Sequence, residues 1–146
     1  FYNVSGLAPG LRPTGQPTHL IRRAAMAAAG LLPELVIAGD DWDTRDGTCI
    51  RDYIHVDDVV GGILQALYNG PANTPYECLG TGQGYTVKEV ADAMKRITGV
   101  DFDVRIGPRR AGDVVSMLCP STYRHLKINH SLEDMCLSAY QGVKNA

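Results

Sequence analysis

Apolar and polar residues alternate along this chain in a pattern that predicts both strands and helices. Short apolar segments typical of strands lie at 1–5, 35–38, 49–54, 76–79 and 103–106. Apolar residues recur at helical spacing over 18–29, 56–68 and 87–98, near 122–127, and from Ser131 onwards. Strands that alternate with helices indicate α/β architecture.

Local signals define the ends of several of these elements. Thr86 and Glu89 have the spacing of a capping box at the start of the 87–98 helix, and Gly99 is expected to end it. A Pro- and Gly-rich loop is expected over 8–17, and a polar loop containing four aspartates over 39–47. The alternation of 103–106 predicts a half-buried strand.

Size and charge narrow the classes of function. At 146 residues the chain is one domain at most, or part of a larger one. A net charge of -2, with no basic cluster longer than Pro108–Arg110, argues against nucleic acid or an anionic membrane as partner. No apolar stretch reaches the length of a membrane span. Because the chain opens at Phe1, in what reads as the middle of a strand, we expect an N-terminal part of the protein to be absent from it.

Cysteines and histidines give no metal-binding pattern. The four cysteines and four histidines lie at 49, 78, 119 and 136, and at 19, 55, 125 and 130. None of these spacings matches a zinc site, so we expect no metal. Reduced thiols are the expected state of the cysteines, which favours a cytoplasmic location.

Two segments carry residue types that suit a nucleotide. Arg51 and Tyr53 alternate on a predicted strand, so both point to one face. A guanidinium there can pair with phosphate while the ring packs against base or ribose. In the loop 108–113, Arg109 or Arg110 can clamp a diphosphate while Asp113 accepts a ribose hydroxyl. Taken alone, each segment is more typical of surface charges, at a strand-to-helix junction for the first and in a solvated loop for the second.

The glycine-rich segment 80–84 invites a cofactor-loop interpretation. Its spacing is Gly-x-Gly-x-Gly, which differs from the Gly-x-Gly-x-x-Gly that fits a pyrophosphate. A tight strand-to-helix turn is therefore the favoured interpretation. Tyr140 and Lys144 have the spacing of a catalytic Tyr-x-x-x-Lys pair, but we interpret this match as chance because no nucleotide fold precedes it.

The run 47–58, Gly-Thr-Cys-Ile-Arg-Asp-Tyr-Ile-His-Val-Asp-Asp, closely resembles UDP-glucose 4-epimerases of the extended short-chain dehydrogenase/reductase family. Four other segments resemble the same family and occur in the same order as in its members: 1–6, 18–21, 36–41 and 108–113. They cover essentially the whole chain, as the C-terminal part of a longer family member, and weaken after Asp113. The implied fold is the substrate-binding part of such an enzyme, with a few strands belonging to an otherwise missing Rossmann sheet.

The resemblance also implies roles for individual residues. Arg110 and Asp113 take the positions that contact the UDP moiety, and Arg51 would join them on the diphosphate. Asn3 takes the position that meets the sugar nucleotide, and His19 and Leu20 take positions that help to hold the substrate. Ala38 stands where family members usually carry a Phe or Tyr that packs on the uracil. With Tyr53, the expected substrate-binding residues are Asn3, His19, Leu20, Ala38, Arg51, Tyr53, Arg110 and Asp113.

The implied activity is NAD-dependent epimerisation at C4 of UDP-glucose or UDP-galactose, through a 4-keto intermediate. The NAD loop and the catalytic Tyr-x-x-x-Lys would precede Phe1, so no catalytic residue is expected in this chain. A homodimer is implied for the full-length family member. Two alternatives remain open: a truncated, non-catalytic protein with a structural or assembly role, and another UDP-sugar enzyme of the family, such as a decarboxylase or a 4,6-dehydratase. The resemblance does not separate UDP-glucose from UDP-N-acetylglucosamine.

Overall fold

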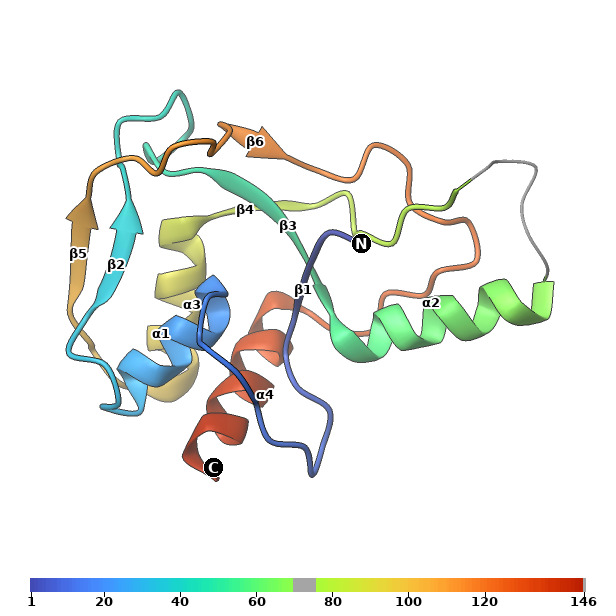
Figure 1. The fold of residues 1–146 in the computed structure, drawn as a ribbon, viewed down its shortest axis with the longest axis horizontal. Coiled ribbons are helices and arrows are strands. Elements are labelled where there is room, and N and C mark those ends of the chain that lie inside the picture. Colours follow the sequence, from blue (N-terminus) through green and yellow to red (C-terminus); the bar gives the residue numbers. More distant parts are fainter. Residues whose placement is uncertain (70–75, 146) are drawn as a thin grey trace.

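Strand β3 (Ile50–His55) is the centre of the larger sheet (Figure 1). In the computed structural model, which describes residues 1–69 and 76–145, the second half of β3 pairs in parallel with β1 (Asn3–Ser5). Its first half lies between β4 (Gly84–Thr86), which is antiparallel to it, and β6 (Ser116–Met117), which is parallel. The register sets Asn3 beside Tyr53, so residues fifty positions apart meet at one place in the sheet.

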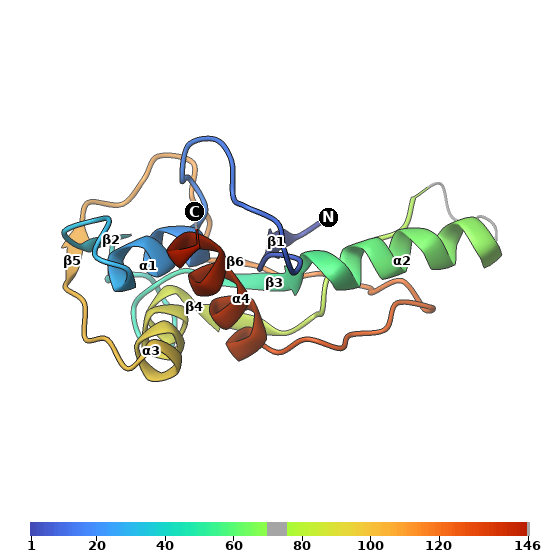
Figure 2. The same ribbon diagram turned by 90° about the horizontal axis from the view of Figure 1, so that it is seen from below.

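Three helices pack against one another beside this sheet: α1 (Leu20–Ala28), α3 (Val87–Thr98) and α4 (Leu132–Lys144) (Figures 1 and 2). The small side chains of α1, among them Ala24 and Ala25, are fully buried and allow the close approach of the other two helices. The predicted capping box of α3 is present, and Gly99 ends that helix in the left-handed conformation, with φ of 69°.

A second, two-stranded parallel sheet joins β2 (Leu35–Ala38) to β5 (Val104–Gly107). Leu35 and Ile37 of β2 point into the core and are buried. The prediction that 103–106 is half-buried is wrong, because β5 pairs only with β2 and its residues Val104 and Ile106 remain exposed.

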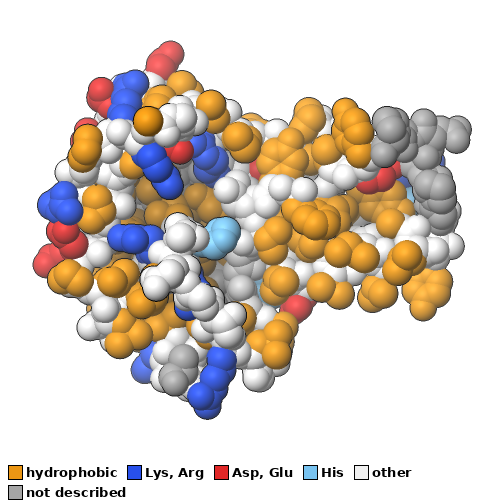
Figure 3. Space-filling view, in the orientation of Figure 1, with side chains coloured by type: hydrophobic (Ala, Val, Ile, Leu, Met, Phe, Trp, Pro, Cys, Tyr) orange, Lys and Arg blue, Asp and Glu red, His pale blue; other side chains and the backbone are white. Residues whose placement is uncertain are grey.

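Helix α2 (Val56–Asn69) extends away from the rest of the molecule in both ribbon views (Figures 1 and 2). The helix is as predicted, but its apolar stripe is not covered by the described residues: only Val59 is buried, whereas Leu67 is 75% exposed. Figure 3 shows hydrophobic side chains concentrated over this part of the molecule.

The structure overturns two predicted elements. Residues 76–79 form no strand; Cys78 makes only an isolated bridge with Thr122. Residues 122–127 form a turn rather than a helix, because Thr122 takes part in that bridge and Tyr123 donates its N–H to the carbonyl of Cys78 at 2.9 Å. Strands β4 and β6 were not predicted, because segments of two or three residues give too short a pattern. The α/β architecture itself is confirmed.

No helix among the described residues is long and apolar enough to span a membrane.

Candidate functional site

A cavity of about 600 Å³ opens where β1, β2, β3, β5 and the start of α1 meet. All eight residues expected to bind substrate line it: Asn3, His19, Leu20, Ala38, Arg51, Tyr53, Arg110 and Asp113. These residues come from five separate segments of the chain, and only the fold brings them together. Thr18, Arg23, Val36 and Pro108 line the same cavity and were not expected there.

The cavity contains an arginine pair that shares one carboxylate. Arg51 donates from Nη1 to the carbonyls of Ile50 and Val114, each at 2.8 Å, and its Nη2 lies 3.6 Å from Oδ1 of Asp113. Arg110 approaches the other oxygen of Asp113, with Nε 3.3 Å from Oδ2. The carbonyl contacts fix the guanidinium of Arg51 in the wall, whereas the side chain of Arg110 is 72% exposed. Two guanidiniums held loosely by one carboxylate suit a phosphate-bearing ligand.

Asn3 and Tyr53 form the sheet side of the cavity. Asn3 donates from Nδ2 to the carbonyl of Asp52 at 2.7 Å, which orients its amide across the β1–β3 pair. Tyr53 is 4% exposed and belongs to the core formed with α1, α3 and α4. Burial raises the pKa of its phenol, so the hydroxyl stays protonated at neutral pH. Tyr53 therefore offers a fixed, neutral wall.

Arg109 holds together the two loops beside the cavity. Its guanidinium lies 4.0 Å from the ring centre of Trp42 and donates from Nε to Asp41 at 2.6 Å. The hydrogen bond from Arg109 lowers the pKa of the Asp41 carboxyl. Trp42 in turn donates from Nε1 to the carbonyl of Ala38 at 3.3 Å. Arg109 is thus engaged in structure, while Arg110 lines the cavity.

The glycine-rich turn 80–84 is filled by a side chain of the protein. The buried carboxylate of Asp52 accepts hydrogen bonds from the backbone N–H groups of Thr81, Gly82 and Cys119, at 2.9, 2.8 and 3.1 Å. It also accepts from the Thr81 hydroxyl at 2.6 Å. Because this carboxylate occupies the donors that would otherwise face a phosphate, the turn has a structural role. No local pattern predicted the hydrogen-bond partners of Asp52, because they lie about 30 and 67 positions away along the chain.

Three potential metal ligands, His55, Asp57 and His130, have ligand atoms within 4.8 Å of one another. The two imidazole rings stack at 4.0 Å with 17° between their planes. A metal lies in the plane of each imidazole that binds it, and two nearly parallel planes do not meet within bonding distance. Moreover, Nδ1 of His55 accepts the N–H of Asp57 at 3.1 Å, and Nδ1 of His130 lies 2.8 Å from Asp58. The group links β3, α2 and the start of α4.

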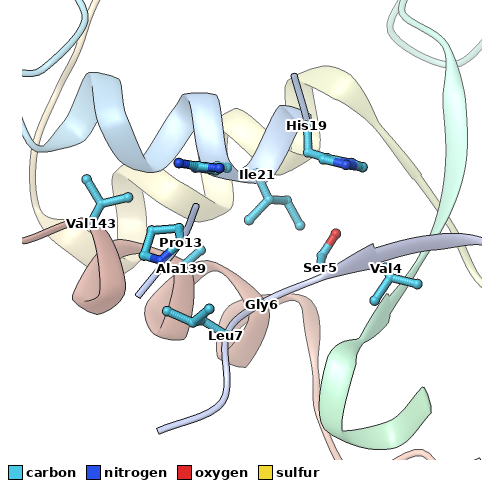
Figure 4. A pocket seen from close by; sticks show the side chains of 10 residues that line it. Val4, Ser5, Gly6, Leu7, Pro13, His19, Ile21, Ala139 and Val143 are labelled. Atoms are coloured by element: carbon cyan, nitrogen blue, oxygen red, sulfur yellow. The ribbon is translucent and has the colours of Figure 1, made fainter. Parts of the chain in front are cut away.

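A smaller cavity of about 110 Å³ adjoins the large one and shares Ser5 and His19 with it (Figure 4). Its other walls are mainly apolar, with Leu7, Ile21 and Val143 pointing inward. Tyr140 and Lys144 line neither this cavity nor the large one; the Lys144 ammonium lies 5.5 Å from the Tyr140 ring.

Comparison with known proteins identifies the family. The NAD dependent epimerase/dehydratase family matches residues 1–78. A UDP-glucose 4-epimerase of Caenorhabditis elegans is 41% identical over 140 residues, which is 90% of this chain and 40% of that protein.

Two solved structures agree with this relationship. The UDP-glucose 4-epimerase of Stenotrophomonas maltophila, with bound NAD and formylated UDP-arabinopyranose, is 39% identical with a TM-score of 0.87, and the match covers 97% of this chain and 45% of that one. The enzyme of Bifidobacterium longum, in complex with NAD+ and UDP, is 33% identical with a TM-score of 0.89, over 99% and 46% of the two chains. The chain spans less than half the length of these relatives. It belongs to the NAD dependent epimerase/dehydratase family.

Proposed function

We propose that this chain is the C-terminal, UDP-sugar-binding part of an NAD-dependent UDP-glucose 4-epimerase. The observation that carries the proposal is the convergence of eight residues, expected from the sequence, on one cavity. The proposed reaction is epimerisation at C4 of UDP-glucose or UDP-galactose through a 4-keto sugar. The similar enzymes of known structure hold UDP or a UDP-sugar derivative together with NAD.

In this proposal the cavity binds the nucleotide and leaves the sugar accessible. Arg51 and Arg110 neutralise the diphosphate, and Asp113 accepts a hydrogen bond from the ribose. The N-terminus of α1, where His19 makes no capping hydrogen bond, presents unpaired N–H groups that favour an anion. Asn3 orients the substrate beside the phosphates. Binding energy is thus applied away from the reacting carbon, which anchors a substrate whose sugar must turn over.

The family is NAD dependent, but two features of this chain that could suggest a site for NAD do not fit that group. The glycine-rich turn 80–84 is occupied by Asp52, and Tyr140 and Lys144 lie outside the cavity. In this proposal the cofactor and the catalytic groups belong mainly to residues outside 1–146, a view supported by the relatives, which are more than twice as long as this chain. Its assembly as a homodimer and its cytoplasmic location are further parts of the proposal, the latter supported by four unpaired cysteines.

The binding proposal can be tested by isothermal titration calorimetry of UDP and UDP-glucose into the native full-length protein. We expect saturable binding of UDP and UDP-glucose. A folded protein that shows no heat with either would overturn it.

The alternative function is a non-catalytic, epimerase-like protein that retains the cavity. Expression of residues 1–146 alone tests whether this segment can bind the cofactor or catalyse the reaction. We expect no NAD binding and no product in a coupled epimerase assay. Micromolar NAD affinity of this segment would show that the cofactor site has been misplaced. If the native full-length protein binds UDP-glucose but does not convert it to UDP-galactose, the non-catalytic alternative is correct.

A further inference from the structure

Arg23 lines the large cavity, although neither strand pattern nor motif pointed to it. It lies four residues after His19, one turn further along α1, so both side chains lie on the same face of the helix. Its backbone N–H donates to the carbonyl of His19 at 3.0 Å, which closes the first turn of the helix. The helical spacing therefore accounts for the position of Arg23 at the cavity.

The other arginines around the cavity are already engaged. Arg51 contacts two carbonyls and Asp113, Arg110 contacts Asp113, and Arg109 contacts Asp41 and Trp42. Arg22, next to Arg23, donates to the carbonyl of Thr14 at 2.6 Å. The guanidinium of Arg23 makes no hydrogen bond or ion pair with any residue in 1–69 or 76–145, although the residue is partly buried.

The charge of the Arg23 guanidinium at the cavity wall is therefore not balanced by an ion pair with any described side chain. The cavity lining thus carries three guanidiniums against the single carboxylate of Asp113, and one of the three is unpaired. A ligand with two negative charges would balance this excess. A diphosphate has that charge, and its oxygens match the fork of a guanidinium.

We propose that Arg23 is a third diphosphate-binding residue, which acts with Arg51 and Arg110. The inference rests on the proposed function, since it assigns another contact to the same ligand. It differs from the other two contacts in that Arg23 lies on α1, whereas Arg51 lies on β3 and Arg110 in the loop 108–113. On binding, the free guanidinium would gain its only ionic partner.

The test compares the affinities of the Arg23→Ala and Arg22→Ala variants for UDP, inorganic pyrophosphate and uridine. Both substitutions are made in the native full-length protein. Arg22→Ala is the matched control, because it removes the same charge from the adjacent position of the same helix. We expect Arg23→Ala to weaken binding of UDP and of pyrophosphate about tenfold relative to that control, while uridine affinity stays unchanged. Arg23→Lys should recover part of the loss, since an ammonium keeps the charge but not the fork.

The outcomes separate this inference from the proposed function. If UDP binds and Arg51→Ala weakens it, but Arg23→Ala matches Arg22→Ala, the role of Arg23 is refuted and the proposed function stands. If uridine affinity falls as much as UDP affinity, Arg23 acts only through the structure of the cavity, which also refutes the inference. If pyrophosphate binds in an Arg23-dependent manner while UDP does not bind, the anion site stands and the proposed nucleotide function fails.

Discussion

At the scale of single residues, neighbouring side chains around the cavity have different positions: some line the cavity, and others hold the surrounding loops. Arg109 and Arg110 are adjacent in sequence, yet the first stacks on Trp42 and the second lines the cavity. Asp113 lies between two guanidiniums at 3.3 and 3.6 Å, which leaves its carboxylate loosely held. Such contacts decide which substitution should affect binding.

Substitution of Arg51 or Arg110, the two arginines proposed above to bind the diphosphate, should weaken UDP binding. We expect Arg51→Ala and Arg110→Ala each to cost about 1.5–3 kcal/mol, as for other hydrogen bonds to charged groups, and Arg51→Lys to recover only part. Arg109→Ala is the control and should have a milder effect, because Arg109 holds the neighbouring loop. Calorimetry with UDP measures all four variants. Unchanged affinity in both the Arg51→Ala and Arg110→Ala variants would disprove the clamp.

The buried carboxylate of Asp52 should matter for stability rather than for binding. Asp52→Asn places an amide NH2 opposite backbone donors, so we expect a loss of about 1–3 kcal/mol in the free energy of unfolding. Asp101→Asn is the matched control: its side chain is 91% exposed and should change little. Urea unfolding of both variants measures the difference. Equal midpoints would show that the hydrogen bonds to Asp52 contribute no net stability.

At the scale of elements, a histidine pair joins three of them. His55 ends β3, its Nδ1 accepts the N–H of Asp57 at the start of α2, and its Nε2 lies 3.2 Å from the Ser138 hydroxyl of α4. Burial lowers the pKa of His55, and the neighbouring His130 lowers it further; Asp57, Asp58 and Asp134 act in the opposite direction. The junction is therefore built around a neutral imidazole.

Acidification should weaken this junction. Because the pKa of His55 in the folded chain lies below its ordinary value of 6.5, the unfolded chain binds more protons below that pH. Stability is thus fully present above pH 6.5 and is lost as the pH falls below it. The measurement is the thermal midpoint between about pH 7.5 and 5.5, in the wild type and in His55→Gln. The variant should show a smaller fall, and parallel curves would contradict this assignment.

At the scale of the whole molecule, the chain combines a packed body with an extended helix that carries apolar side chains outward. The body contains the core between α1, α3 and α4, whereas Val60, Leu64 and Leu67 of α2 are 49%, 48% and 75% exposed. Contiguous apolar surface of this kind favours association. In the family relationship shown above, this chain spans less than half of its relatives.

Residues 1–146 alone should therefore associate or unfold without a sharp transition. We expect sedimentation of this segment to show species larger than the monomer, and Leu64→Lys with Leu67→Lys to reduce them, because charged side chains disfavour burial of that face. Leu11→Lys, at another exposed apolar position, is the control and should have no such effect. A monomer with a cooperative thermal transition would overturn the prediction.

Much of the fold followed from local patterns. The periodicity of α3 and α4, the Thr86–Glu89 capping box and the apolar strand 35–38 are properties of neighbouring residues, and the structure confirms them. The predicted strand at 76–79 and helix at 122–127 were wrong because their backbones pair with each other across the chain. Such pairing depends on contacts between distant segments, which a local pattern does not contain.

The sequence by itself determined the alternation of elements, the absence of a pyrophosphate-type glycine spacing, and which eight residues carry the resemblance to the epimerases. Only the tertiary structure decided that those eight line one cavity, that Asp52 fills the glycine turn, and that Arg23 joins Arg51 and Arg110. It also decided that the apolar stripe of α2 lies exposed among the described residues. The physical reason is that spacing along the chain fixes which residues share a helix or strand face, whereas burial and side-chain pairing depend on what the rest of the chain places opposite.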